Sequence, residues 1–314
     1  MSLLVAVKGW NPAPWATRLS ARLPGRAIRT WPDAIGEASD IRYALAWKAP
    51  AEALSACPNL EVIFSLGAGV DHLLGQPALP RVPVVRVVDP DLTARMAEWV
   101  VLQVLLHHRQ HLAYAAQQRE RVWRDLPQPA ARSVRVGIMG LGVLGERAAR
   151  AVAGLGFDVA GWARGRKQIE GIDCYAGEEE MDVFLQRTDI LVNLLPLTPQ
   201  TTGLVNSRVL ARLARDGALG GPVFINAGRG GSQVEDDLAA ALRDGTLKAA
   251  SLDVFETEPL PATSPFWQME NVVVSPHVAA DSDPEAISDY VAEQILAYEA
   301  TGVLRNRVDP GTGY

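Results

Sequence analysis

Short apolar runs alternate with longer amphipathic stretches along the first ninety residues. Two stretches carry apolar residues at helical spacing, Pro14–Leu23 and Ala51–Ala56. Four short apolar runs have the pattern of strands: Leu3–Val7, Tyr43–Trp47, Val62–Ser65 and Val84–Val87. Strands that alternate with helices predict a parallel sheet covered by helices.

A second and longer alternating series occupies the rest of the chain. Between the two series, the stretch from Thr93 to about Arg121 contains no Pro or Gly and predicts one long helix, which ends before LPQPA at 126–130. Asp283 and Pro284 have the pattern of an N-cap and a first helical residue, so a final helix is expected from there to about Thr301. Six further strands are predicted: Val134–Met139, Val159–Trp162, Ile190–Leu194, Val223–Asn226, Ala249–Asp253 and Val272–Ser275. This half predicts a larger, doubly wound parallel sheet.

Composition and charge narrow the class of protein. The 314 residues suffice for one large domain or two of ordinary size, and the formal net charge of −6 comes without any basic tract, so nucleic acid is not an expected partner. Cys57 and Cys174 lie far apart, which argues against disulfides and a zinc site and favours a reducing cytoplasm. The sequence has neither a signal-peptide pattern nor an apolar stretch long enough for a bilayer, so no membrane partner is expected.

A glycine cluster of the form GxGxxG follows the predicted strand at Val134–Met139 and precedes a predicted helix at Glu146–Leu155. In a dinucleotide-binding unit, the glycines permit the turn, the approach of a pyrophosphate and the packing of the helix, whose N-terminal N–H groups bind the phosphates. The alternative is a structural strand–helix turn, and the flanking strands favour dinucleotide binding. The residues expected at the phosphates are Gly140, Gly142, Val143, Leu144 and Gly145.

The end of the next predicted strand indicates which dinucleotide binds. An NAD-binding unit usually has an acidic residue there for the ribose 2′-hydroxyl, and this chain has Ala163. The cations Arg164, Arg166 and Lys167 follow, and a guanidinium binds a 2′-phosphate through two parallel N–H bonds. With Trp162, they are assigned to the cofactor site. NADP(H) is therefore favoured over NAD(H), the alternative being a solvated basic loop.

Three later motifs each follow a predicted strand: INAGRG at 225–230, LDVFETEP at 252–259 and SPH at 275–277. Their residues Arg229, Glu258 and His277 are therefore expected to converge beyond the carboxyl ends of the sheet. A hydride delivered to a ketone carbon leaves charge on the oxygen, which requires a proton donor. A histidine with a carboxylate partner supplies that proton, and an arginine binds the carboxylate of a 2-oxo acid and polarises its carbonyl. The three residues therefore fit the chemistry of 2-oxo acid reduction.

At this point the sequence resembles the D-isomer-specific 2-hydroxyacid dehydrogenase family, most closely its glyoxylate/hydroxypyruvate reductase branch. The resemblance covers nearly the whole chain: SLGAGVDH at 65–72, the glycine cluster, LPLTPQTTGLVN at 195–206 and the three motifs above. It implies that Arg229 binds the substrate, that Glu258 supports the histidine, and that His277 is the general acid. The implied substrates are glyoxylate and hydroxypyruvate.

The resemblance also implies further site residues. Trp47 is a substrate-pocket aromatic by this comparison, with a core tryptophan as the alternative. The implied substrate-binding loop is Leu66, Gly67, Ala68 and Gly69, and the further implied cofactor contacts are Leu195, Pro196, Thr201, Ala227, Gly228, Asp253 and His277. Asp253 is expected near the nicotinamide amide. The family usually has Ala where this chain has Gly228, which is expected to loosen Arg229 slightly.

The architecture implied by the resemblance is two Rossmann-like or flavodoxin-like α/β domains with a cleft between them. Residues 1–92 and 284–314 are expected to bind substrate and residues 93–283 to bind the dinucleotide, in a homodimer. No metal is expected. His107 and His111 are spaced to share one face of the predicted long helix, where a solvated or interfacial face is favoured over a metal site.

Two alternative functions are retained. One is a dehydrogenase of the same family that acts on a bulkier 2-oxo acid such as phenylpyruvate. The other is a protein that senses NAD(P)H without relying on turnover, like the C-terminal-binding protein corepressors that share the scaffold. The intact set of Arg229, Glu258 and His277 disfavours the second alternative.

Overall fold

The computed structural model describes residues 2–309 and 311, and the chain divides into two compact units. The second unit consists of Thr93–Asp281. The first unit consists of the chain before it, up to Leu92, and the chain after it, from Ser282. Each unit contains one parallel sheet, which confirms the predicted α/β fold with two parallel sheets. The assignment of substrate binding to one unit and dinucleotide binding to the other stays a prediction.

The first unit contains a five-stranded sheet in the order β2-β1-β3-β4-β5. Its strands are β1 (Ser2–Val7), β2 (Ala27–Thr30), β3 (Ile41–Trp47), β4 (Val62–Ser65) and β5 (Val84–Val85). Strand β2 is absent from the sequence-based prediction. It is a short edge strand whose residues are all at least partly exposed, so it lacks the apolar run that marks the inner strands.

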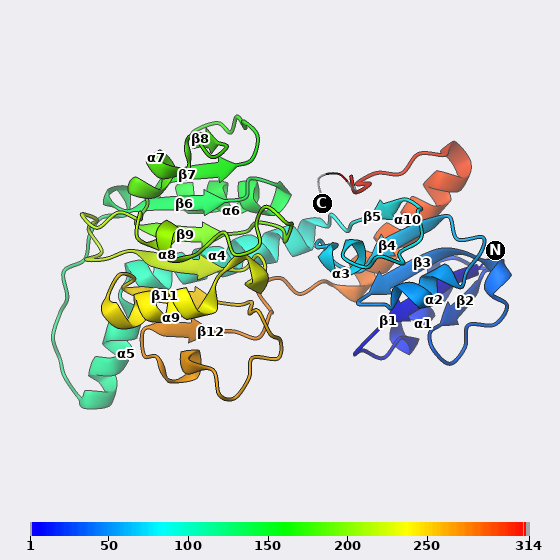
Figure 1. The fold of residues 1–314 in the computed structure, drawn as a ribbon, viewed down its shortest axis with the longest axis horizontal. Helices are drawn as coiled ribbons and strands as arrows, with labels where there is room; N and C mark the ends of the chain where they lie inside the picture. Colours follow the sequence, from blue (N-terminus) through cyan, green and yellow to red (C-terminus); the bar gives the residue numbers. More distant parts are fainter. Residues whose placement is uncertain (1, 310, 312–314) are drawn as a thin grey trace. The chain divides into compact units, whose positions relative to one another are not determined.

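Helices cover both faces of this sheet. Alternate residues of β1 divide between the faces, with Leu3, Val5 and Val7 packed on one side and Leu4 and Ala6 on the other. The helices α1 (Ala13–Arg22) and α10 (Pro284–Thr301) pack on the first side, and α2 (Ala51–Ser55) and α3 (Asp71–Leu74) on the second (Figure 1). The 3₁₀ turn η1 spans Ala38–Asp40.

The predicted start of the last helix is confirmed. The side chain of Asp283 accepts a hydrogen bond from the Glu285 N–H at 3.1 Å, directly before Pro284. Helix α10 then binds α1 through Glu285, which pairs with Arg18 at 2.6 Å and with Arg22 at 2.8 Å. These ion pairs attach the C-terminal helix to the N-terminal part of the chain.

The second unit contains a seven-stranded parallel sheet in the order β12-β11-β10-β9-β6-β7-β8. Its strands are β6 (Arg135–Met139), β7 (Asp158–Ala163), β8 (Asp173–Ala176), β9 (Ile190–Asn193), β10 (Val223–Asn226), β11 (Ala249–Leu252) and β12 (Val272–Val274). Read from β8, the order is that of a Rossmann fold with one strand added, and the chain reverses direction across the sheet between β6 and β9. The edge strand β8 is another element that the sequence pattern does not predict.

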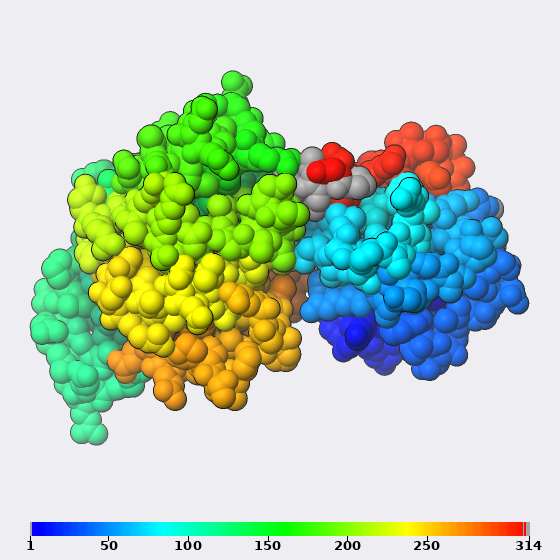
Figure 2. Space-filling view, in the orientation of Figure 1, coloured from blue at the N-terminus to red at the C-terminus, as the bar shows by residue number. Residues whose placement is uncertain are grey.

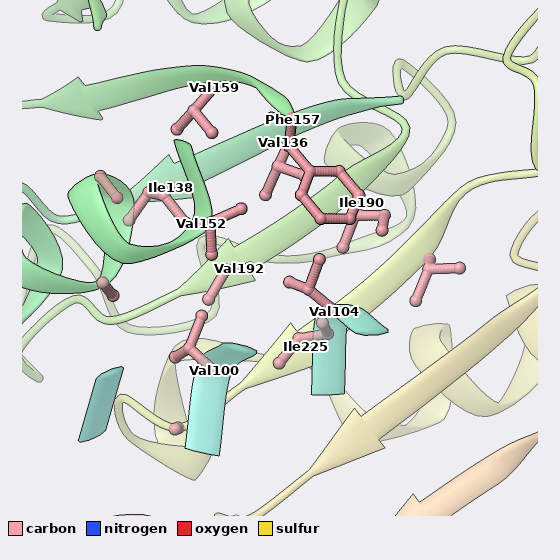
Figure 3. Packing of buried hydrophobic residues seen from close by; sticks show 14 of the residues in the cluster. Val100, Val104, Val136, Ile138, Val152, Phe157, Val159, Ile190, Val192 and Ile225 are labelled. Atoms are coloured by element: carbon pink, nitrogen blue, oxygen red, sulfur yellow. The ribbon is translucent and has the colours of Figure 1, made fainter. Parts of the chain in front are cut away.

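Two hydrophobic layers fill the spaces between this sheet and its helices. Val136 and Ile138 of β6 pack with α4 (Pro90–His108) and α6 (Val143–Ala153) on one face. Figure 3 shows Val100 and Val104 of α4 directed at the strands that carry Val192 and Ile225. On the opposite face, the sheet packs against α7 (Met181–Gln186), α8 (Ser207–Leu210) and α9 (Glu235–Asp244). The 3₁₀ turns are η2 (Ala131–Ser133), η3 (Gly230–Ser232) and η4 (Pro265–Gln268).

The single long helix predicted from Thr93 to Arg121 is wrong. Helix α4 begins earlier, at Pro90, where the carboxylate of Asp89 accepts a hydrogen bond from the Leu92 N–H at 2.8 Å. It ends at His108, and α5 (His111–Glu120) follows. Gln110 adopts a left-handed conformation, with φ of 54°, and its side-chain amide donates to the Pro127 carbonyl. The sequence has no Gly or Pro at this break, because the contact between Gln110 and the Pro127 carbonyl stabilises it instead.

The expected solvated or interfacial histidine face is therefore wrong for His107, while His111 is exposed. The helix break removes the shared face of His107 and His111, and His107 and His108 are both buried. The His107 Nε2 atom lies 2.8 Å from Ser251 Oγ on β11. Burial, with a smaller effect of the Lys248 charge, lowers the pKa of His107 to about 4. His107 is thus a neutral core residue of the second unit.

Within the described residues, no group of three or more His, Cys, Asp or Glu side chains is placed to hold a metal ion. No helix in that part of the chain has both the length and the hydropathy needed to cross a membrane.

Candidate active site

The glycine cluster forms a tight turn at the carboxyl end of β6. Gly140 has φ of 100°, and a Cβ atom there would lie 2.8 Å from the Leu194 carbonyl oxygen. A Cβ atom on Gly145 would lie 1.7 Å from the Gly140 carbonyl oxygen. Both positions therefore require glycine, one for backbone conformation and one for contact with the turn.

The space beside the middle glycine is open. A Cβ atom on Gly142 would meet nothing within 4 Å, and Gly142 is the N-cap of α6. No side chain caps this N-terminus, where Val143 is 45% exposed while Leu144 packs against the core. An uncapped helix N-terminus next to open backbone, at the reversal point between β6 and β9, fits the pyrophosphate of a dinucleotide.

The end of β7 carries no carboxylate, since its last residue is Ala163. Trp162 is a core residue whose indole N–H donates to the Gly177 carbonyl at 2.8 Å. In the following loop, the Arg166 guanidinium donates to the Cys174 carbonyl at 2.8 Å and pairs with Glu180. The Ala176 backbone N–H and then Arg166 lower the pKa of the Glu180 carboxyl.

This loop contains three exposed cationic residues, Arg164, Arg166 and Lys167. An oriented guanidinium next to further positive charge, with no acid at the strand end, fits a 2′-phosphate better than a 2′-hydroxyl. The Trp162 side chain lies in the core, and the cofactor contacts of Arg164, Arg166 and Lys167 stay predictions.

His277 and Glu258 form a hydrogen-bonded pair. The distance between His277 Nδ1 and Glu258 Oε2 is 2.9 Å, and the two side chains remain 39% and 26% exposed. The other carboxylate oxygen of Glu258 accepts from the Phe255 backbone N–H at 3.2 Å. This orientation leaves the Nε2 edge of the imidazole for a substrate, as a general acid requires.

The loop that carries His277 is bound to Asp253, which is 1% exposed. Its carboxylate accepts from Ser275 Oγ at 2.6 Å and from the backbone N–H groups of Val278 at 3.0 Å and Ala279 at 2.9 Å. Asp253 was expected near the nicotinamide amide. The structure shows its carboxylate engaged with this loop, and a cofactor contact stays a prediction.

Arg229 follows β10, between two glycines that are both packed against backbone. A Cβ atom on Gly228 would lie 2.7 Å from the Leu195 carbonyl oxygen. Gly228 also donates its N–H to Asn226 Oδ1 at 3.0 Å, and its carbonyl accepts from the Arg229 guanidinium at 2.8 Å. The expectation that Gly228 loosens Arg229 is therefore wrong, because glycine here permits a close contact that holds the loop.

Arg229, Glu258 and His277 follow β10, β11 and β12, which are neighbours in the sheet. The segments after β10 and β11, yellow to orange in Figure 2, adjoin on the surface of the second unit. Parallel strands end at the same edge, so the topology brings the three predicted residues to one end of the sheet.

The predicted substrate-binding loop follows β4 in the first unit. Ser65 Oγ binds across it, accepting from the Gly67 N–H at 3.4 Å and donating to the Gly69 carbonyl at 3.1 Å. Within the described residues, the N–H groups of Ala68 and Gly69 find no acceptor. Leu66 is buried, and its N–H donates to the Ala46 carbonyl. The loop therefore presents backbone donors of the kind that bind a carboxylate.

Trp47 is half-buried at the end of β3, in the same unit. Its ring stacks on Trp10 with centroids 5.4 Å apart and lies 4.7 Å from the ring of His72. A Cβ atom on Gly67 would lie 2.9 Å from the Trp47 ring. Trp47 thus packs against neighbouring rings but remains partly accessible. The choice between a substrate-pocket aromatic and a core tryptophan therefore stays open.

The remaining predicted cofactor residues lie in the loops after β9 and β10. The Thr201 hydroxyl donates to the Pro196 carbonyl at 2.6 Å and accepts from the Thr198 N–H at 2.8 Å, so it already stabilises its own loop. Leu195 donates its N–H to Asn193 Oδ1 at 3.3 Å, and the buried Ala227 donates to the Asn193 carbonyl. Their contacts with a cofactor stay predictions.

Sequence reasoning missed a group of buried polar residues beside Arg229. Asn193, Asn226, Ser232 and Gln233 are at most 1% exposed and bind one another. A signal was present, since Asn193 and Asn226 end otherwise apolar strands, where a buried amide requires partners.

Comparisons with known proteins agree with this architecture. The family model for the NAD binding domain of D-isomer specific 2-hydroxyacid dehydrogenases matches residues 101–279. The glyoxylate/hydroxypyruvate reductase A of Serratia proteamaculans is 40% identical over 311 residues, covering 97% of this chain and 97% of that protein. An NADPH-dependent glyoxylate/hydroxypyruvate reductase from Sinorhizobium meliloti, solved with NADP and sulfate, is 50% identical with a TM-score of 0.95 and full coverage of both chains. A D-isomer specific 2-hydroxyacid dehydrogenase from Xanthobacter autotrophicus Py2, solved with NADPH and MES, is 41% identical with a TM-score of 0.94 and covers 100% of this chain and 99% of that one.

Proposed function

Because this chain belongs to the D-isomer-specific 2-hydroxyacid dehydrogenase family, we propose that it reduces small 2-oxo acids, namely glyoxylate and hydroxypyruvate, with NADPH. The family membership confirms the resemblance drawn from the motifs, and it makes the protein an NAD(P)-dependent oxidoreductase. The preference for NADP agrees with the ligands of the structures from Sinorhizobium meliloti and Xanthobacter autotrophicus and with the basic loop after β7.

The observation that carries the proposal is the pair of His277 and Glu258, 2.9 Å apart. NADPH, when bound, supplies a hydride to C2 of the substrate. Protonated His277 donates its Nε2 proton to the oxygen on C2, while Glu258 at Nδ1 orients the ring and stabilises its positive charge. The product is a D-2-hydroxy acid, or glycolate where the substrate is glyoxylate.

Substrate binding is assigned to two sets of donors. The Arg229 guanidinium binds the carboxylate and polarises the adjacent carbonyl, since it offers parallel N–H groups to two oxygens. The N–H groups of Ala68 and Gly69 are the second set, and their lack of acceptors within the described residues supports this role. Trp47 is assigned to the substrate pocket as an aromatic residue, supported by its half-buried ring next to Gly67.

The cofactor is assigned to the end of the second sheet near β6 and β7. The turn from Gly140 to Gly145 and the α6 N-terminus hold the pyrophosphate, because Gly142 leaves room for close approach. Arg164 and Arg166 bind the 2′-phosphate. The geometry of the Gly140–Gly145 turn supports the first assignment, and the position of the basic loop directly after β7 supports the second.

A homodimer remains part of the proposal. Leu102 on α4 is 57% exposed, and Trp123, which follows α5, is fully exposed. Large apolar side chains at such positions favour contact with another chain. Sedimentation at several protein concentrations measures the oligomeric state directly.

The test is a matrix of assays that follow loss of reduced-nicotinamide absorbance. Glyoxylate, hydroxypyruvate and phenylpyruvate are each tested with NADPH and with NADH. Rapid oxidation of NADPH by the two small acids is expected. Faster turnover of phenylpyruvate would point to the dehydrogenase for bulkier acids. Tight NADPH binding without turnover of any acid would contradict the reductase and support the sensing protein.

A further inference from the structure

Four buried polar side chains join the ends of β9 and β10 to the turn η3. Asn193 Nδ2 donates to Asn226 Oδ1 at 2.9 Å and to Ser232 Oγ at 2.7 Å. Asn226 Nδ2 donates to Gln233 Oε1 at 2.8 Å. We call Asn193, Asn226, Ser232 and Gln233 the amide cluster. All four are at most 1% exposed, so water does not substitute for their mutual hydrogen bonds.

Two members of the amide cluster, Asn226 and Ser232, donate to the backbone carbonyl of Arg229. This oxygen receives Ser232 Oγ at 2.6 Å, the Ser232 N–H at 3.2 Å and Asn226 Nδ2 at 3.3 Å. Three donors on one oxygen fix the orientation of the peptide that follows Arg229. The direction in which the Arg229 side chain leaves the backbone is fixed with it.

The backbone on both sides of Arg229 is equally restricted. A Cβ atom on Gly228 would lie 2.7 Å from the Leu195 carbonyl oxygen, and one on Gly230 would lie 1.9 Å from the Phe255 carbonyl carbon. The loop after β10 is therefore packed between the loops after β9 and β11. A shift of Arg229 requires a shift of all three.

The same contacts reach Glu258. Gln233 Nε2 donates to the Val254 carbonyl at 3.2 Å, and the next residue, Phe255, donates its N–H to Glu258 Oε1 at 3.2 Å. Glu258 then binds His277 at 2.9 Å. A continuous set of hydrogen bonds and backbone contacts thus runs from Arg229 to the imidazole.

We propose that the amide cluster is a set of positioning residues that fixes Arg229 relative to the Glu258–His277 pair. The inference rests on the proposed function, because it assigns Arg229 to the substrate. Transfer to a small 2-oxo acid requires the group that binds its carboxylate and the group that protonates its carbonyl at a set separation. Buried amides supply that separation because they accept only a narrow range of geometries.

The test compares two serine-to-alanine variants of equal burial. Ser232→Ala removes the hydroxyl that links Asn193 to Arg229. Ser251→Ala is the matched control: Ser251 is also 0% exposed, and its hydroxyl binds His107, which has no assigned role in the reaction. Ser232→Cys keeps a weaker donor at the same position.

Oxamate, which mimics a 2-oxo acid, is titrated into each protein saturated with NADPH, and kcat and KM for glyoxylate are measured alongside. Ser232→Ala is expected to raise the oxamate Kd and the glyoxylate KM about tenfold, as loss of one buried hydrogen bond does. The NADPH Kd stays within about twofold. Ser232→Cys falls between wild type and Ser232→Ala, and Ser251→Ala leaves all three constants unchanged.

Two outcomes overturn the inference in distinguishable ways. Oxamate binding by Ser232→Ala that equals wild type, with a loss of stability equal to that of Ser251→Ala, would make the cluster a stabilising feature only. A wild-type protein that neither binds oxamate nor reduces glyoxylate would overturn the proposed function, and the assignment of Arg229 with it.

Discussion

Asp253 accepts hydrogen bonds from three consecutive backbone N–H groups, the first of which belongs to His277. The His277 N–H donates to the Asp253 carbonyl at 2.8 Å, and the next two N–H groups donate to its carboxylate at 3.0 and 2.9 Å. His277 has φ of 55°, a left-handed conformation that non-glycine residues rarely adopt and that surrounding contacts must maintain. Asp253 provides those contacts.

Asp253→Asn is expected to lower kcat about tenfold or more, with a smaller change in the NADPH Kd. An amide offers one acceptor oxygen where the carboxylate offers two, so the Val278 or the Ala279 N–H loses its acceptor. The His277 N–H keeps its bond to the Asp253 backbone carbonyl, but the loop that carries His277 is held less firmly. Single-turnover measurement of NADPH oxidation gives the rate, and fluorescence titration gives the Kd. Ser275→Ala, which removes one hydrogen bond to the same carboxylate, gives a smaller loss of rate. An Asp253→Asn variant with wild-type kcat and much weaker NADPH binding would contradict the positioning role and favour the nicotinamide contact.

Arg164→Ala and Arg166→Ala are expected to raise the KM for NADPH about tenfold or more and to leave the KM for NADH nearly unchanged. The 2′-phosphate is the group that distinguishes the two cofactors, and the proposed function assigns each guanidinium to charge-assisted hydrogen bonds with it. Steady-state kinetics with both cofactors check this. Equal increases for NADPH and NADH would mean that the loop serves the fold and not the phosphate.

Gly228→Ala is expected to raise the glyoxylate KM about tenfold or more and to lower the stability of the second unit by about 1–3 kcal/mol, because the added methyl overlaps backbone. That methyl would lie 2.7 Å from the Leu195 carbonyl oxygen and would displace Arg229. Gly154→Ala is the control, since its Cβ would meet neighbours at an ordinary 3.4 Å. Glyoxylate kinetics and urea unfolding of both variants provide the measurement. Wild-type kinetics for Gly228→Ala would show that the loop tolerates the methyl.

His107 makes stability depend on pH. Its pKa in the folded protein is about 4, below the ordinary value of 6.5, so the unfolded chain binds a proton at mildly acidic pH that the folded chain does not. Little stability is lost above pH 7, and the loss grows as pH falls towards 4, reaching about 2 kcal/mol at pH 5.

Urea unfolding of wild type and His107→Gln at pH 7 and pH 5 measures this loss. Glutamine retains a hydrogen-bonding group for Ser251 and does not titrate, so the variant is expected to lose about 2 kcal/mol less than wild type between the two pH values. Equal losses in the two proteins would assign the acid sensitivity to other groups.

The sequence by itself determined the α/β class, the inner strands and the family to which the chain belongs. Inner strands are buried on both faces, so Val62–Ser65 and Val223–Asn226 were predicted with the bounds that the structure shows. The glycine cluster and the three motifs of Arg229, Glu258 and His277 each follow such a strand, and parallel strands end at one edge. Their approximate grouping therefore follows from local patterns.

Only the tertiary structure decided the features that depend on contacts between distant segments. Gln110 breaks a helix that local propensity favours because its side chain binds Pro127, and His107 is buried because β11 places Ser251 beside it. Gly228 permits a close backbone contact and does not add flexibility, because the loop after β9 packs against it. Local propensity is a small free-energy preference of each residue for helix or strand. Packing and buried hydrogen bonds between distant segments contribute more free energy, so they override that preference in the folded chain.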